Sequence, residues 1–370
     1  QLSKNVPEMS EDTLVGIASS TLAGRLAGYL NVYGANCNVD AACASSLAAL
    51  AIAAQQLRDG ICRCAVAGAV DSDLTIDTFV NFCKLHALAT KISRPFMDGT
   101  DGFTMGEGTG VLLLKPLALA LADGDPVYAR VVGIGMSSDG NQGTMTMPSA
   151  EGQRLAIQRA FDMSGFEPAS VGFVEAHGTG TEVGDRVELE VLHHVFEGVS
   201  PRSVALGAVK AHIGHLKSAA GMAALIKTIS AMHHRVIPPA LIEGKPRTEL
   251  RDGRSPLRLP AMAEQWRRRG ALPRRAVVSS FGFGGSNYHV HLEEMDEGLR
   301  RMTPSRLLLF TGRDRADMAA RIAAWRNAVV AAGQVDFFDP AQLRWLGGDG
   351  PCRLAAAWNT GKTAWGEACA

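Results

Sequence analysis

Residues 36–57 read NCNVDAACASSLAALAIAAQQL, a short stretch followed by a run rich in alanine and leucine. The pattern predicts a strand over residues 36–40, a tight turn, and a helix over residues 43–57. Cys43 would then lie at the mouth of the helix, where backbone N–H groups and the helix dipole favour an anion. We therefore expect the pKa of its thiol to fall below the usual value of about 8.5, which makes Cys43 a candidate nucleophile. This stretch alone leaves a second interpretation open, in which Cys43 is a small buried hydrophobic residue.

Strands alternate with helices along the rest of the chain. Strands are predicted at residues 63–70, 110–115, 127–136, 171–176, 204–209, 276–280 and 288–292, and helices at residues 12–30, 150–164, 185–196 and 218–233. This alternation predicts an α/β fold with mostly parallel sheets. A strand that ends at a reactive residue leads into an alanine-rich helix twice, first at Cys43 and again at residues 210–221. A duplicated half is therefore expected.

The composition limits the classes of function. The chain has 370 residues, with 37 Lys and Arg against 37 Asp and Glu, so no net positive charge attracts a nucleic acid backbone. The richest apolar stretch, residues 221–232, is interrupted by Lys227 and is too short to cross a bilayer. The seven cysteines lack the spacing of a disulfide framework, so we expect reduced thiols in a cytoplasmic protein. Cys62 and Cys64 have no further ligands nearby in the sequence for a zinc site.

Three further segments carry side chains typical of a reaction site. In EAHGTGTEVGD, residues 175–185, His177 follows a predicted strand and precedes glycines that let a ligand approach the backbone. In KAHIGHLKSAAG, residues 210–221, Lys210 closes a strand and His215 precedes a helix of small residues. In SFGFGGSN, residues 280–287, the glycines allow backbone N–H groups to face an oxyanion, and Phe283 could exclude water. We expect these segments and Cys43 to meet at one pocket.

Together, the four segments resemble the β-ketoacyl synthase, or condensing enzyme, family of the thiolase-like fold, found in fatty acid and polyketide synthases. The resemblance covers residues 1–293 and implies a layered α/β/α/β/α architecture from two duplicated halves, residues 1–115 and 126–293. It implies an acyltransferase that joins a cysteine-bound acyl chain to a malonyl or substituted malonyl group by decarboxylative Claisen condensation. Residues 294–370, with a predicted strand at 306–311 and helix at 315–332, would be a linker or the start of a next module.

The resemblance also implies a role for each matching residue. Cys43 would be the acylated nucleophile, and His177 and His215 would donate hydrogen bonds to the extender thioester while malonyl loses carbon dioxide. Backbone N–H groups of Cys43 and Phe283 would hold the oxyanion on the acyl carbonyl. Other matching residues would have supporting roles. Lys210 would orient the histidines, with Asp185 and Glu188 as its carboxylate partners. Thr179 and Thr181 would bind the phosphopantetheine arm, and Phe283 and Asp139 would belong to gating loops.

The resemblance further implies which partners to expect. The domain would bind no cofactor itself, because its substrates arrive on the phosphopantetheine of an acyl carrier protein. Family members are dimers, so we expect a homodimer with the strand before Cys43 near the twofold axis, and no nucleic acid or membrane partner. The segment after residue 294 favours a type I polyketide or polyunsaturated fatty acid synthase over a free-standing enzyme.

Some departures from the family pattern leave an alternative open. The chain starts at Gln1 without the family's usual N-terminal portion, so we expect a piece of a longer protein. Met97, Ser286 and His212 stand where an aspartate, a threonine and an asparagine are usual. The main alternative is a non-catalytic, chain-length-factor-like scaffold in a synthase dimer, although such relatives have another residue at position 43. A biosynthetic thiolase would use a second cysteine where this chain has a histidine.

Overall fold

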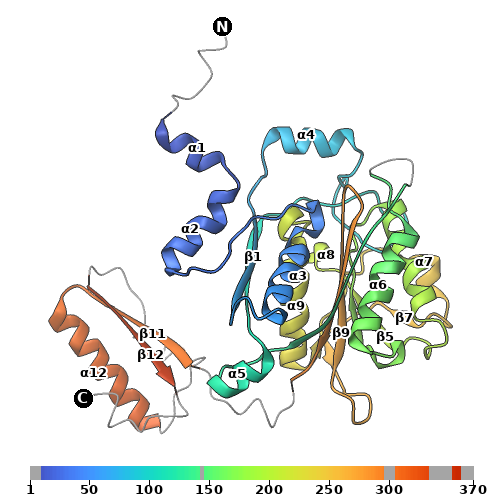
Figure 1. The fold of residues 1–370 in the computed structure, drawn as a ribbon. Helices are drawn as coiled ribbons and strands as arrows, with labels where there is room; N and C mark the ends of the chain where they lie inside the picture. The colour runs from blue at the N-terminus through green and yellow to red at the C-terminus, as the bar shows by residue number, and fades with distance from the viewer. Residues whose placement is uncertain (1–9, 142–145, 296–304, 333–351, 360–370) are drawn as a thin grey trace. The chain divides into compact units, whose positions relative to one another are not determined.

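A six-stranded sheet lies at the centre of the larger of two compact units (Figure 1). The computed structural model describes residues 10–141, 146–295, 305–332 and 352–359. The larger unit comprises Gln1–Leu119 and Tyr128–Asp296, and the smaller one Ala120–Val127 and Glu297–Ala370. The sheet has the order β3-β10-β9-β4-β5-β7, with bounds β3 (Arg130–Ser138), β4 (Phe173–Glu175), β5 (Val204–Gly207), β7 (Leu257–Arg258), β9 (Arg275–Gly282) and β10 (Ser286–Glu293).

Only part of this sheet is parallel, so the prediction of mostly parallel sheets is partly wrong. β4 pairs in parallel with β5 and β9, whereas β10 runs antiparallel to both β9 and β3. Only residues 283–285 join β9 to β10, and a parallel crossover needs about a dozen residues or more, so this connection must reverse the chain. Two small antiparallel sheets complete the unit: β1 (Ala65–Asp71) with β2 (Gly108–Leu114), and β6 (Val236–Ile237) with β8 (Glu264–Gln265).

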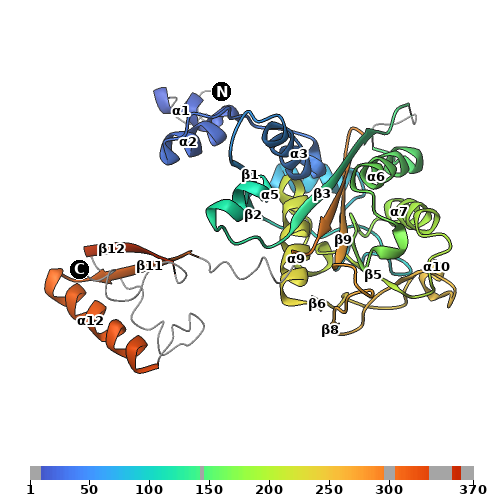
Figure 2. The same ribbon diagram turned by 60° about the horizontal axis from the view of Figure 1, so that its bottom comes forward.

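Helices cover both faces of the six-stranded sheet (Figures 1 and 2). α6 (Ala150–Ser164) packs on β3 and β10, with α7 (Glu182–Val195) beside it. On the other face, α3 (Ser45–Arg58) and α9 (Ala220–His234) lie between the six-stranded sheet and the β1–β2 pair. The described residues thus form layers of helix, sheet, helix and sheet, in which only β1 and β2 represent the expected second half-sheet.

The predicted helices are confirmed, with shifts at their ends. Those at 43–57, 150–164, 185–196 and 218–233 correspond to α3, α6, α7 and α9, and the pattern at 12–30 forms two helices, α1 and α2. The remaining bounds are α1 (Glu11–Ile17), α2 (Ser20–Leu30), η2 (Ala42–Ala44), α4 (Ile76–Lys84), α5 (Leu117–Asp123), η3 (Pro168–Ser170), α8 (Lys210–Ile213), η4 (Lys217–Ala219) and α10 (Thr248–Arg251).

The strand predicted before Cys43 is wrong. Residues 35–41 form no strand, although the prediction placed one at 36–40. A strand is defined by its hydrogen bonds to a neighbour, and none of the described segments pairs with these residues. The other predicted strands of the larger unit are confirmed within a few residues of their expected positions.

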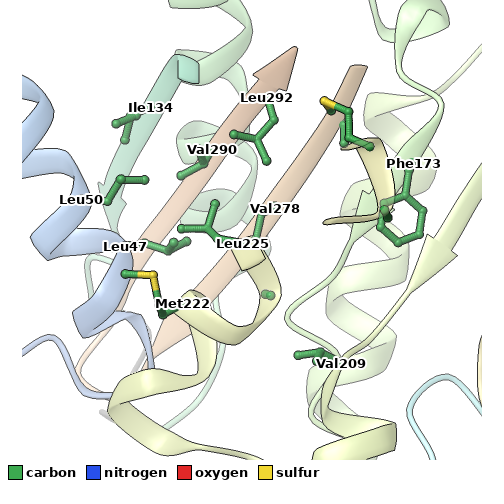
Figure 3. Close-up of a cluster of buried hydrophobic side chains, with 14 of the residues drawn as sticks. Leu47, Leu50, Ile134, Phe173, Val209, Met222, Leu225, Val278, Val290 and Leu292 are labelled. Atoms are coloured by element: carbon green, nitrogen blue, oxygen red, sulfur yellow. The ribbon is translucent and has the colours of Figure 1, made fainter. Parts of the chain in front are cut away.

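The hydrophobic core joins the two central helices to the same sheet (Figure 3). Fully buried side chains from α3, α9, β9 and β10 pack together there: Leu47, Leu50, Met222, Leu225, Val278, Val290 and Leu292. Each such side chain stabilises the fold by roughly 1.5–3 kcal/mol relative to an exposed position. Because Cys43 precedes α3 and His215 precedes α9, this core holds both residues near the same end of the sheet.

Among the residues described from 305 onward, the smaller unit contains a two-stranded antiparallel sheet and a helix. β11 (Ser305–Gly312) pairs with β12 (Cys352–Asn359), and α12 (Arg315–Ala332) packs against them. The predicted strand at 306–311 and helix at 315–332 are confirmed, whereas β12 was not predicted. None of the helices described in either unit has the length and apolar character needed to span a membrane.

We expect the protein to lose stability in mild acid, because two histidines on β10 are buried. His289 and His291 hydrogen-bond the hydroxyls of Ser279 (2.9 Å) and Ser164 (2.8 Å), and burial lowers their pKa values to about 3 and about 2. In the unfolded chain both rings take up a proton below about pH 6.5. At these two positions the unfolded state therefore binds more protons between pH 6.5 and 3, and their contribution to stability falls as the pH is lowered through this range. At pH 5 each ring lowers the free energy of unfolding by about 2 kcal/mol relative to pH 7.

Urea unfolding at pH 7 and pH 5 measures this loss. The His291→Gln variant should lose less stability between the two pH values than the wild type does, because glutamine does not titrate. His194→Gln, which replaces an exposed histidine, is the matched control and should keep the wild-type pH dependence. An unchanged pH dependence in His291→Gln would contradict the prediction.

Candidate active site

Cys43 lies at a sharp turn between an irregular segment and α3. Residue 42 has a left-handed backbone (φ 48°), and η2 then leads into the helix. The Ser45 hydroxyl accepts a hydrogen bond from the Ala41 amide (2.9 Å), and the Asp40 carboxylate accepts one from the Ala42 amide (2.8 Å). A left-handed alanine costs roughly 1–2 kcal/mol, so these contacts are needed to hold the thiol at the turn.

The turn after β9 reaches the Cys43 sulfur. The Ser280 hydroxyl donates to the Cys43 carbonyl (2.7 Å), and the backbone N–H groups of Cys43 and Phe283 both contact the thiol. Gly282 permits this approach, because a Cβ atom there would lie 2.1 Å from the carbonyl oxygen of Ala41. Two amides from distant parts of the sequence therefore converge on the sulfur, which is the geometry that an oxyanion hole requires.

The expected low pKa of the Cys43 thiol is wrong for this structure. Burial raises the pKa of the thiol, because a thiolate loses its hydration there. The Lys210 ammonium and the amides of Phe283 and Cys43 lower the pKa but do not outweigh the effect of burial. The sequence pattern placed the thiol correctly before a helix, but it contained no information on how far the thiol is removed from water.

His177 lies in the loop between β4 and α7 and presents a neutral ring. Its Nδ1 atom is 3.3 Å from the Phe281 amide and 3.4 Å from the Lys210 ammonium, and both of these groups can only donate hydrogen bonds. We therefore assign Nδ1 as the acceptor and place the ring proton on Nε2. Burial, with the nearby Lys210 and His215, holds the pKa of His177 well below its usual value. The free edge of the ring is thus an N–H donor.

His215 is also a neutral ring with its proton on Nε2, but a different contact fixes this tautomer. Its Nδ1 atom accepts a hydrogen bond from the Lys217 amide (2.9 Å), so its proton also lies on Nε2. Burial lowers the pKa of His215 well below its usual value, and Lys210 and Lys217 lower it further. The two imidazole centroids are 5.9 Å apart, and the Phe103 ring packs edge-on against His215 at 4.8 Å. Two neutral N–H donors therefore lie side by side.

Two buried carboxylates of α7 hold the loop that carries His177. The Glu188 oxygens accept hydrogen bonds from the amides of His177 (2.7 Å) and Gly178 (2.8 Å). Asp185 accepts one from the Gly180 amide (3.0 Å), and burial raises the pKa of Asp185 to about 7. Both carboxylates therefore position the backbone of the loop.

Lys210 hydrogen-bonds His177 directly, whereas its interaction with Asp185 and Glu188 is only electrostatic. It lies in the first turn of α8 and is almost fully buried, and its ammonium donates a hydrogen bond to the His177 carbonyl. Burial lowers the pKa of Lys210, while Cys43, Glu188 and Asp185 raise it. In the described part of the chain, Asp185 and Glu188 form no ion pair with Lys210, so these expected partners act on it through charge alone.

The remaining expected site residues lie around this centre. Thr179 and Thr181 are half-buried in the loop after His177, with their hydroxyls 3.0 Å apart. Asp139 accepts a hydrogen bond from the Asn287 side chain (2.7 Å), and its amide donates to the Gly285 carbonyl (2.9 Å). The Phe283 ring, by contrast, is exposed and stacks on Phe82 of α4 with centroids 6.5 Å apart.

The sequence reasoning missed Glu175, a fully buried residue at the end of β4. Its carboxylate accepts hydrogen bonds from the Val209 amide (2.5 Å) and the Lys227 ammonium (2.7 Å). It thereby joins the segment before His177 to the segment before Lys210. A detectable signal was present, since Glu175 is an acidic residue in an otherwise apolar strand.

Comparisons with known proteins identify the family. Residues 2–120 match the family described as β-ketoacyl synthase, N-terminal domain, and residues 128–242 match β-ketoacyl synthase, C-terminal domain. The chain is 41% identical over 305 residues to a polyunsaturated fatty acid synthase of a Thraustochytrium species, covering 79% of this chain and 11% of that protein. It is 40% identical over 303 residues to polyketide synthase ThaG of Burkholderia thailandensis, covering 77% of this chain and 5% of that protein.

A solved structure agrees with these relatives. The ketosynthase from module 6 of the bacillaene synthase of Bacillus subtilis 168 superposes with a TM-score of 0.77 and 32% identity, covering 95% of this chain and 64% of that one. The chain thus spans less than two thirds of this structure and a small part of the curated relatives. The thiolase-like α/β fold class is confirmed. The chain belongs to the β-ketoacyl synthase family, the condensing acyltransferases of polyketide and fatty acid synthases.

Proposed function

We propose that this chain elongates an acyl chain bound to Cys43 by decarboxylative Claisen condensation with a malonyl or substituted malonyl thioester. One observation carries this proposal: the thiol contacted by two backbone amides lies in the same site as two neutral imidazoles that offer N–H groups. The Phe281–Phe283 segment links the groups, because its first amide contacts His177 and its last contacts the sulfur.

The first half-reaction is acyl transfer to Cys43. The sulfur loses its proton and attacks the thioester of the incoming acyl chain, and the carrier thiol leaves with a proton. The positive charge of Lys210 favours the thiolate against the cost of burial. Forming this covalent intermediate divides one difficult reaction into two easier ones.

The second half-reaction forms the carbon–carbon bond. The malonyl carboxylate leaves as carbon dioxide, and its electron pair moves to the thioester enolate, whose oxygen receives hydrogen bonds from Nε2–H of His177 and His215. The enolate carbon then attacks the acyl carbonyl on Cys43, and the amides of Cys43 and Phe283 hold the resulting oxyanion. Collapse of this intermediate releases the Cys43 thiolate and the β-ketoacyl thioester. Lys210, Asp185 and Glu188 position the histidines in this scheme.

The proposed substrates arrive on the phosphopantetheine of an acyl carrier protein. The half-buried hydroxyls of Thr179 and Thr181 offer hydrogen bonds to the amides of that arm. Phe283 and Asp139 flank the Gly284–Gly285 turn, and we assign them to the gate through which the arm enters. This domain would bind no cofactor of its own.

The proposed assembly is a homodimer within a longer type I synthase. Residues 35–41 are mostly exposed and have no strand partner in the described larger unit, which supports their pairing with a second copy. Residues 1–293 would form the synthase domain, with halves 1–115 and 126–293, and residues 294–370 a linker or the start of a next module. The chain from Glu297 onward belongs to a separate compact unit, together with Ala120–Val127, which supports a boundary near residue 294. Free cysteines such as Cys62 support a cytoplasmic location.

Mass spectrometry tests this function. The full-length protein that carries this chain is incubated with an acyl group on an acyl carrier protein, digested and analysed. We expect an adduct of the acyl mass on the peptide that contains Cys43, and on no other cysteine. The alternative scaffold function predicts no adduct, and that result would overturn the proposal.

A further inference from the structure

The turn that sets the His215 tautomer is held by an ion pair. The Lys217 amide donates to Nδ1 of His215 at 2.9 Å, and Lys217 itself has a left-handed backbone (φ 47°) at the start of η4. A left-handed conformation is unfavourable for a residue with a side chain. The turn therefore needs an external contact to keep the Lys217 amide directed at the ring.

Asp71 supplies that contact from the end of β1. Its carboxylate lies 2.8 Å from the Lys217 ammonium, and both side chains are only 12% exposed. The other carboxylate oxygen is 3.0 Å from the Ser218 hydroxyl and 3.3 Å from the Ser218 amide. The Lys217 ammonium also donates to the Gly106 carbonyl (3.1 Å). One carboxylate thus binds two consecutive residues of the turn.

We propose that Asp71, through its ion pair with Lys217, is a positioning residue that keeps Nε2–H of His215 directed at the extender thioester. Asp71 contacts neither His215 nor the reacting atoms. Asp71 acts on His215 through Lys217. The Lys217 side chain is paired with Asp71, and the Lys217 backbone amide donates to Nδ1 of His215. The positive charge of Lys217, held close to the ring by this pair, also lowers the pKa of His215 and so favours the neutral imidazole. This inference rests on the proposed function.

Measuring malonyl decarboxylation and acyl transfer separately distinguishes the positioning role of Asp71 from a general structural role. In the full-length protein, Asp71→Asn and Lys217→Met should each lower the rate of malonyl decarboxylation by about tenfold, because a small misplacement of a reacting group has effects of this size or larger. The rate of acyl transfer to Cys43 should stay within about twofold of the wild type, since that step does not use Nε2–H of His215. The double variant should be no slower than either single variant, because the two side chains act as a unit. Lys217→Arg, which keeps the pair, should restore most of the decarboxylation.

Arg130→Gln is the matched control, because it breaks another partly buried ion pair, with Glu293 (2.8 Å), at the opposite end of β10 from the site. It should leave both half-reactions unchanged. Wild-type decarboxylation in Asp71→Asn and Lys217→Met would overturn the inference, and so would a parallel loss of both half-reactions. A wild-type protein that neither accepts an acyl group nor decarboxylates malonyl would instead overturn the proposed function, so the two failures are distinguishable.

Discussion

Replacing Cys43 with alanine is expected to abolish acyl-enzyme formation and to lower condensation by at least about 1000-fold, because it removes the sulfur to which we propose that the acyl chain is attached. Malonyl decarboxylation should persist in part, since the imidazoles of His177 and His215 take their hydrogen bonds from groups other than the thiol. Acyl loading followed by mass spectrometry, and release of labelled carbon dioxide from malonyl on an acyl carrier protein, measure the two outcomes.

Cys62→Ala is the matched control for this variant. Cys62 is also free and half-buried, but it lies in the loop between α3 and β1, so its loss should leave loading and condensation unchanged. A chloroacetyl or cerulenin-type probe should label the wild type and Cys62→Ala. Labelling of Cys43→Ala by the same probe would contradict the assignment of the nucleophile.

The sequence predicted the helices best, because their apolar spacing is a local property. α6 begins and ends at the predicted residues, and α3 and α9 lie within three residues of their predictions. Strand direction was predicted less well, because it depends on which strands become neighbours. The antiparallel β9–β10 pair follows from its short connection, whereas residues 36–40 look like a strand but have no neighbour in the described part of the unit.

Motifs predicted which residues gather at the site but not what each contacts. Cys43 and His215 were found because each precedes a helix rich in small residues, and His177 because glycines and threonines follow it in the sequence. The spacing of Asp185 and Glu188 could not reveal that their oxygens accept hydrogen bonds from loop amides. The pKa of Cys43 was predicted in the wrong direction, because burial raises it and burial is a property of the folded chain that the local sequence pattern does not contain.

Replacing His215 or His177 with alanine is expected to lower malonyl decarboxylation by about 10²–10³-fold, the usual cost of losing one donor to a developing oxyanion. The double variant should lose less than the product of the two single effects, because both donors serve one enolate oxygen. Acyl transfer to Cys43 should continue in all three variants, so mass spectrometry and carbon dioxide release on the same samples separate the two half-reactions.

The neutral state of both rings leads to a second, independent expectation for the pH dependence of malonyl decarboxylation. Burial lowers the pKa values of His177 and His215 well below their usual range, so neither ring changes its charge near neutrality. Decarboxylation by the wild type should therefore not follow a histidine titration between about pH 6 and 8, where an ordinary imidazole loses its proton. A rate that rose or fell with an apparent pKa near about 6.5, and lost that dependence in His215→Ala, would show that the ring acts as a titrating acid or base. The fixed Nε2–H donor derived from the Lys217 amide would then be wrong.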